Sequence, residues 1–80
     1  MESYQTTVLA TPAGGYKVNV TFSNGEHGVF DMTPYLNYPC YAPLKEPQVF
    51  ARVVAAHGTL AWPEEIDISP EAVWADAVRV

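Results

Sequence analysis

The chain has 80 residues, of which 49% are hydrophobic and 16% are charged, and its four basic and nine acidic residues give a formal charge of −5. A chain of this length holds one hydrophobic core, so we expect a single domain over residues 1–80, with no room for a separate catalytic domain. The hydrophobic content excludes a disordered chain, and the acidic balance with scattered Lys and Arg excludes a nucleic-acid binder.

Three strands are predicted in the first part of the chain. Residues 5–11 are rich in Thr, Val and Leu and are followed by turn-forming residues, a pattern typical of a strand closed by a loop. Apolar and polar residues alternate over residues 16–22, which predicts a strand with one buried face. Asn24-Gly25 then favours a tight hairpin turn, and residues 29–31 form the returning strand. The pattern predicts a three-stranded antiparallel meander.

Two helix starts share one sequence signal, a hydroxyl residue directly before a proline. Thr33 before Pro34 predicts a short helical turn through Leu36, and Ser69 before Pro70 predicts a final helix. In both we expect the hydroxyl to cap the helix. The apolar side of the final helix is expected to consist of Val73, Trp74, Ala77 and Val78.

The middle of the chain is dominated by prolines. Three prolines between residues 39 and 47 exclude a long helix there. Helical spacing of apolar residues then predicts a helix of about two turns over residues 48–55, ended by His57-Gly58. Short strands are expected at residues 59–62 and 66–68. Together these elements predict an α+β fold, in which a small antiparallel sheet combines a three-stranded meander and two short strands with two or three short helices.

Residue types that often serve catalysis or metal binding are few. His27 and His57 lie thirty residues apart beside glycines, and Cys40 has no basic neighbour in sequence to lower its pKa, so we expect neither a metal site nor a reactive thiolate. A lone cysteine also forms no internal disulfide. We predict no cofactor and no enzyme activity. Trp62 and Trp74 are expected in the core, with their indole N–H groups bonded to carbonyls.

The expected cellular compartment follows from the lack of a signal peptide pattern and of a membrane-spanning pattern in the sequence. The first fifteen residues do not combine a basic region with an apolar stretch, and nowhere do eighteen apolar residues run together. We therefore expect a cytoplasmic protein that makes no membrane contact.

Two surface features remain as candidate binding sites. Tyr35, Tyr38 and Tyr41 are spaced by threes through the proline-rich part, and large amphipathic aromatics on a loop are typical of protein interfaces. The alternative is that these tyrosines pack the loop over its own sheet. Glu64 and Glu65, close to Asp67, form an acidic turn that we expect to be solvated, and if these two residues are extended their side chains should point apart. Asp31 and Asp67 are expected to accept hydrogen bonds from the amides that start the two helices.

The combination of several short motifs resembles a known family. These motifs are Asn24-Gly25-Glu26, Asp31-Met32-Thr33-Pro34, Ala42-Pro43-Leu44-Lys45-Glu46-Pro47 followed by Phe50, Trp62-Pro63, and Asp67-Ile68-Ser69-Pro70-Glu71-Ala72. Over about residues 8–74 the chain is similar to the small bacterial family called domain of unknown function 2442. The resemblance implies an α+β domain, often encoded beside another small protein in a pair suspected of toxin and antitoxin behaviour. It assigns no catalytic residues.

The function expected is that of a protein-binding module, in its most specific form the acidic, antitoxin-like partner of a small neighbouring protein. The binding residues predicted are Tyr35, Tyr38, Tyr41, Glu64 and Glu65. An alternative is a structural domain that associates with itself as a homodimer through a free sheet edge. A minor enzyme is a third possibility, disfavoured because no nucleophile, base and orienting residue occur at suitable spacing.

Overall fold

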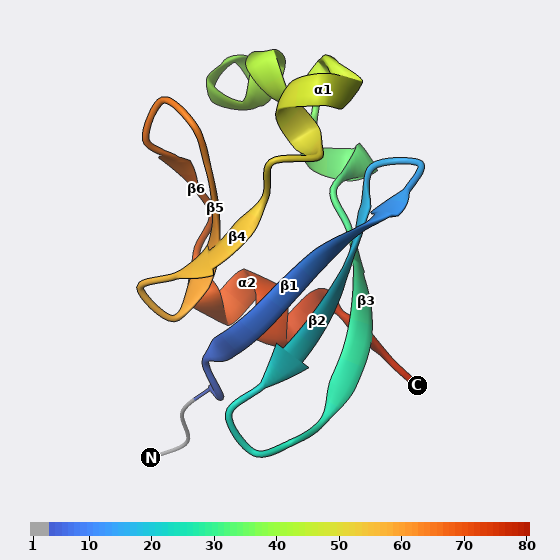
Figure 1. Cartoon of the computed structure of the whole chain (residues 1–80), viewed down its shortest axis with the longest axis vertical. Coiled ribbons are helices and arrows are strands. Elements are labelled where there is room, and N and C mark those ends of the chain that lie inside the picture. The colour runs from blue at the N-terminus through green and yellow to red at the C-terminus, as the bar shows by residue number, and fades with distance from the viewer. Residues whose placement is uncertain (1–3) are drawn as a thin grey trace.

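The computed structural model describes residues 4–80, which form two antiparallel sheets and four short helical segments (Figure 1). The four-stranded sheet has the order β1-β2-β3-β7 and consists of β1 (Thr7–Gly14), β2 (Lys17–Phe22), β3 (His27–Asp31) and β7 (Val78–Arg79). The three-stranded sheet consists of β4 (Val54–Ala56), β5 (Thr59–Trp62) and β6 (Ile66–Asp67). The helical segments are η1 (Thr33–Tyr35), η2 (Pro39–Lys45), α1 (Pro47–Phe50) and α2 (Pro70–Asp76). The predicted α+β class is confirmed.

The predicted meander is present in β1, β2 and β3, with the expected alternation in β2. Val18, Val20 and Phe22 are buried, whereas Lys17 and Asn19 are exposed. The turn after β2 is longer than predicted. Its loop has three residues, closed by the Phe22 N–H bond to the Glu26 carbonyl at 2.8 Å, and positive φ occurs at Gly25 alone. A type I turn followed by a left-handed glycine explains this geometry.

The first strand is also longer than predicted. β1 continues past Thr11 through Pro12 to Gly14. Proline is tolerated because β1 lies at the edge of its sheet, where a missing N–H breaks no ladder. The strand pair β1–β2 is irregular at Val8 and again between Pro12 and Gly14.

The helix predicted over residues 48–55 is wrong in its second half. Only Pro47–Phe50 is α-helical, and Val54–Ala56 forms strand β4, which pairs antiparallel with β5. His57 and Gly58 do not end a helix but form the two-residue turn between these strands, with φ of 55° and 80°. Positive φ at both central residues is the requirement of a tight hairpin turn. The helical spacing of apolar residues therefore does not determine the structure at the end of this segment, where pairing with β5 forms a strand instead.

The helix starts are correct in position but not in capping. Neither Thr33 nor Ser69 caps its helix through the side chain. At η1 the Asp31 carboxylate accepts the Thr33 N–H at 2.9 Å, as predicted for Asp31. At α2 the Ser69 backbone carbonyl accepts from Ala72 and Val73, and no corresponding bond to Asp67 is present among the described residues.

The end of the chain departs from the predicted helix. α2 ends at Asp76, and Val78, expected on its apolar side, instead lies in β7 with 69% of its surface exposed. β7 pairs antiparallel with β3. A Cβ at Gly28 would lie 2.9 Å from the Val78 carbonyl oxygen, so glycine in β3 permits the close approach of this strand.

One core joins the sheets, α2 and the residues that precede α1. Its largest fully buried side chains include Phe22, Phe30, Met32, Leu44 and Leu60. Trp62 is buried as predicted, and its indole N–H donates to the Phe50 carbonyl at 3.1 Å. Trp74 is only half-buried; its ring meets the Phe22 ring edge-on at 4.9 Å.

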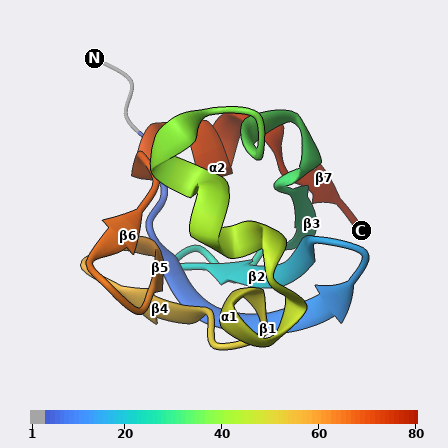
Figure 2. The same cartoon turned by 90° about the horizontal axis from the view of Figure 1, so that it is seen from above.

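Residues 33–50, here called the connector, cross one end of the molecule, from the side of α2 to the side of β1 (Figure 2). Within residues 4–80 no helix has the length and apolar character needed to cross a membrane. The connector carries the three tyrosines of the predicted site, so its position decides what surface they form.

Candidate functional site

The three tyrosines of the connector form one aromatic cluster. The Tyr35 ring centroid lies 6.3 Å from that of Tyr38 and 6.3 Å from that of Tyr41. Tyr35 also contacts the buried Phe30 ring at 5.7 Å. Tyr35 and Tyr41 are partly buried, whereas Tyr38 exposes 56% of its surface. Tyr35 and Tyr41 therefore pack against the fold, whereas the Tyr38 ring is exposed to solvent.

The hydroxyl groups of the two partly buried tyrosines form hydrogen bonds with elements that are distant in sequence. The Tyr35 hydroxyl donates to Asp76 Oδ2 at the end of α2 at 2.8 Å, and the Tyr41 hydroxyl donates to the Asp67 carbonyl of β6 at 3.2 Å. Burial, followed by the bond to negatively charged Asp76, raises the pKa of Tyr35 to about 12. Burial is also the main cause that raises the pKa of Tyr41. Both side chains are thus neutral donors at neutral pH.

Two hollows open beside this cluster. The first, here called the Asp76 hollow, has a volume of about 440 Å³ and is lined by Asp31, Pro34, Tyr35, Tyr38 and Asp76. The second, the Glu64 hollow, has a volume of about 430 Å³ and is lined by Cys40, Tyr41, Glu64, Glu65, Ile66 and Asp67. The structure therefore brings the tyrosines and the acidic turn, separated by more than twenty residues in sequence, onto adjoining surfaces. We call the three tyrosines with both hollows the tyrosine face.

The tyrosine face concentrates negative charge. Its two linings contain five of the nine acidic residues of the chain and no lysine or arginine. The bond from the Thr33 N–H is the main cause that lowers the pKa of Asp31, with a smaller contribution from the positive charge of Lys17. Asp31 is therefore ionised at neutral pH, and the face presents fixed negative charge beside exposed aromatic rings.

The acidic turn is exposed, and its backbone is left-handed and not extended. Glu64 and Glu65 both adopt left-handed backbone conformations, with φ of 68° and 62°, and both are exposed. Such conformations are uncommon for residues other than glycine. They close the short connection between β5 and β6, where Trp62 pairs with Ile66. The turn geometry is therefore imposed by strand pairing.

The histidines and the cysteine lie apart. His27 is on β3, where its Nδ1 lies 3.0 Å from the Thr21 hydroxyl, and His57 is in the β4–β5 turn. Cys40 is exposed on η2 and lines the Glu64 hollow. Within the part of the chain that the structure describes, no three His, Cys, Asp or Glu side chains are grouped to hold a metal ion.

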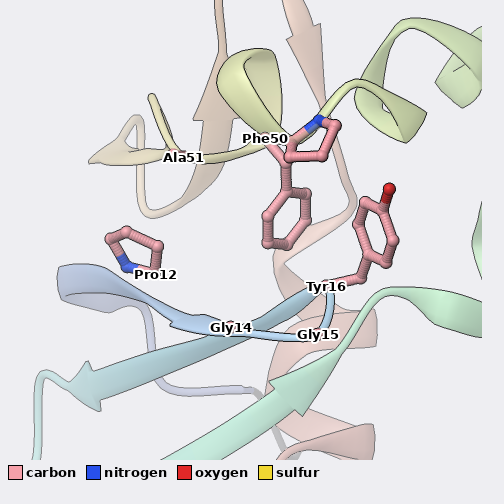
Figure 3. A pocket seen from close by; sticks show the side chains of 7 residues that line it. Pro12, Gly14, Gly15, Tyr16, Phe50 and Ala51 are labelled. Atoms are coloured by element: carbon pink, nitrogen blue, oxygen red, sulfur yellow. The ribbon is translucent and has the colours of Figure 1, made fainter.

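A third hollow, which sequence reasoning missed, lies between α1 and the β1–β2 turn (Figure 3). It has a volume of about 180 Å³, and the Phe50, Tyr16 and Pro12 side chains surround it above the backbone of Gly14 and Gly15. Tyr16 has a φ of 64°, an uncommon conformation for an aromatic residue, and its hydroxyl donates to the Lys45 carbonyl. In the sequence, the pair Gly14-Gly15 directly before Tyr16 indicates the tight turn between β1 and β2 beside which this hollow lies. The lining of this hollow is mainly apolar.

Comparison with known proteins identifies the family. The family model described as protein of unknown function (DUF2442) matches residues 8–79, and the chain therefore belongs to that family. No curated protein and no solved structure matches.

Proposed function

We propose that this member of the family of unknown function 2442 is a protein-binding module whose tyrosine face recognises a basic segment of another protein. The observation that carries the proposal is the exposed Tyr38 ring, which lines the Asp76 hollow with two carboxylates, on a face whose second hollow is lined by three more. Tyrosine supplies a large contact area at small cost in conformational entropy. Fixed negative charge on the same surface favours a partner of opposite charge.

Preorganisation supports this use of the surface. Tyr35 and Tyr41 are each held by a hydroxyl hydrogen bond and by ring contacts with each other. A partner that docks on them does not have to order the connector first, and the entropic cost of binding is reduced accordingly.

A second copy of the chain is less well supported as the partner. The outer strand β7 of the four-stranded sheet and the outer strand β6 of the three-stranded sheet contain two residues each. Very short edge strands resist pairing with another chain. The other edge of the four-stranded sheet is the eight-residue strand β1, which contacts β4 of the second sheet and is the longest edge that a second copy could pair with. Self-association is therefore kept as an outcome of the test below.

In its most specific form, which follows from the family resemblance, the partner is a small protein encoded beside this chain, which the acidic module neutralises. This specific form of the proposal can be tested by the growth of cells. Co-expression of this chain should restore growth to cells that are inhibited by the neighbouring protein alone.

The direct test is capture with the full chain from native-host lysate, followed by calorimetry with each purified captured protein. We expect a basic partner whose affinity falls at high salt and falls at least about tenfold with Tyr38→Ala. Leu9→Ala is the matched control, because Leu9 is at least as exposed as Tyr38 but lies outside both hollows of the tyrosine face.

Two outcomes would contradict the proposal. One is a partner that binds Tyr38→Ala and the parent chain equally well, which removes the tyrosine face as the interface. The other is recovery of the bait alone together with a dimer in light scattering, which favours self-association.

A further inference from the structure

The Asp76 hollow combines two aromatic rings with two carboxylates. The Tyr35 and Tyr38 rings are tilted at 52° to each other, with their centroids 6.3 Å apart. Asp31 and Asp76 complete the lining together with Pro34. Because the face of an aromatic ring carries negative potential, every group that lines this hollow, except the proline, attracts a cation.

Each carboxylate accepts a hydrogen bond within the fold. Asp31 Oδ1 accepts the Thr33 N–H, and Asp76 Oδ2 accepts the Tyr35 hydroxyl. The Thr33 side chain is a second hydrogen-bond partner that lowers the pKa of Asp31, whereas no hydrogen bond engages Asp76 Oδ1 among the described residues. The internal bonds orient both carboxylates, which belong to different elements, the end of β3 and the end of α2.

The positive charge of Lys17, which acts on Asp31, does not neutralise the Asp76 hollow. Lys17 pairs with Asp31 across strands β2 and β3 and contributes a favourable charge to it. Lys17 and Asp31 nevertheless form no ion pair, because the ion pair found within residues 4–80 joins Arg79 to Glu26. The hollow therefore keeps net negative charge.

This arrangement suits a guanidinium group better than an ammonium group. A guanidinium is planar and weakly hydrated, stacks on aromatic rings, and directs N–H groups to several sides at once, so that it can reach acceptors on two residues. An ammonium is compact and strongly hydrated, and it gains less from an open site of this kind. Arg79 of this chain shows the same preference, since its guanidinium lies 4.1 Å from the Trp74 ring centroid and pairs with Glu26.

We propose that the Asp76 hollow is a binding pocket for one arginine side chain, which stacks on Tyr38 and donates hydrogen bonds to Asp31 and Asp76. The inference rests on the proposed function, because it names the side chain by which the basic partner is anchored. The Glu64 hollow contains more carboxylates but only one tyrosine ring, so it is assigned no arginine.

The test uses three small probes with the full chain: the N-acetyl amides of arginine, lysine and norleucine. Each is titrated into isotope-labelled protein and followed by the backbone amide resonances. Arginine should shift the amides of Asp31, Tyr35, Tyr38 and Asp76 with a dissociation constant on the order of millimolar. Lysine should bind at least about threefold more weakly, and norleucine should leave these amides unmoved.

Variants assign the binding to the named groups. Tyr38→Leu keeps an apolar side chain but removes the ring, and Asp76→Asn removes one charge; each should weaken arginine binding about fivefold. Glu64→Gln removes a charge from the neighbouring hollow and serves as the control, with less than about a twofold change expected. Tyr35→Phe keeps the ring and frees Asp76 Oδ2, so binding should be retained.

The inference is overturned if arginine and lysine bind equally, if the shifts lie outside the hollow, or if Tyr38→Leu binds arginine like the parent chain. Its failure is distinguishable from failure of the proposed function. A partner that still depends on Tyr38, with no arginine binding, removes the pocket alone. Arginine bound in the hollow, with no protein partner captured, removes the proposed function alone.

Discussion

The four-stranded sheet and the connector are held together in different ways. In the sheet, β2 forms antiparallel ladders with β1 and β3, of which the ladder with β3 is regular throughout, and the inward side chains of β2 are buried. The connector has only short helical turns, interrupted by prolines, and its backbone bonds run mainly to residues three or four positions away. Its attachment to the rest of the fold therefore depends on individual side chains.

Those side chains are distributed along the whole connector. Leu36, Leu44 and Phe50 are buried in the core, while the Tyr35 and Tyr41 hydroxyls bond to other elements. A segment without a β ladder can therefore be held against the fold by side-chain contacts that recur every few residues. Tyr38 lies between these anchors and exposes its ring because its neighbours already hold the backbone.

The largest effect on the free energy of unfolding is expected at Leu44, the buried leucine through which the connector packs into the core. Leu44 is 0% exposed, so Leu44→Ala should lower the free energy of unfolding by about 3 kcal/mol through lost burial and the cavity it leaves. Leu9→Ala, on an exposed position of β1, should change it by less than about 0.5 kcal/mol.

Urea unfolding of both variants measures the difference. If Leu44→Ala does not fold, Leu44→Val, with one methylene fewer than leucine, should still fold and lose about 1 kcal/mol. Equal stability of Leu44→Ala and Leu9→Ala would show that the connector is not anchored through the core.

A smaller effect tests the link between the connector and the three-stranded sheet. Trp62→Phe removes the indole N–H that bonds to the Phe50 carbonyl, and also leaves a void, so a loss of about 2 kcal/mol in unfolding free energy is expected. Trp74→Phe should cost about 1 kcal/mol, because Trp74 is half-buried and makes mainly ring contacts. A larger loss in Trp74→Phe would reverse the comparison.

The smallest effect at neutral pH concerns the bond between the connector and α2. The pKa of Tyr35 is raised to about 12, above the ordinary value of 10.0 that it has in the unfolded chain. Its contribution to stability is complete below pH 10 and is lost as the pH rises toward 12, because the unfolded chain releases this proton first. Tyr35→Phe should remove that part of the alkaline loss of stability.

Unfolding free energies of both proteins, measured between pH 8 and about pH 12, check this prediction. A spectroscopic titration of tyrosinate adds an independent readout, since the variant should lose the group that ionises last. Parallel stability curves for the two proteins would mean that Tyr35 ionises normally in the fold.

Local patterns predicted much of the fold. The alternation in β2, the glycine-containing turn after it and the helix starts at Pro34 and Pro70 depend on neighbouring residues, and each appears where the sequence indicates. The family resemblance, carried by short motifs, was confirmed over residues 8–79. The sequence also predicts the tyrosines and the acidic turn as surface features, and in the structure they line the two hollows on which the proposed binding role depends.

Tertiary structure decided what local patterns left ambiguous. Val54–Ala56 and Val78–Arg79 are too short for their residue pattern to distinguish helix from strand, and each forms a strand because a partner, β5 or β3, offers its backbone groups. The same packing brought Tyr41 beside Glu64 and placed Asp76 against Tyr35. From the sequence alone we therefore predicted the α+β class, the meander and the residues for a binding face. Only long-range contacts joined those residues into one surface, because spacing along the chain does not specify which distant segments meet.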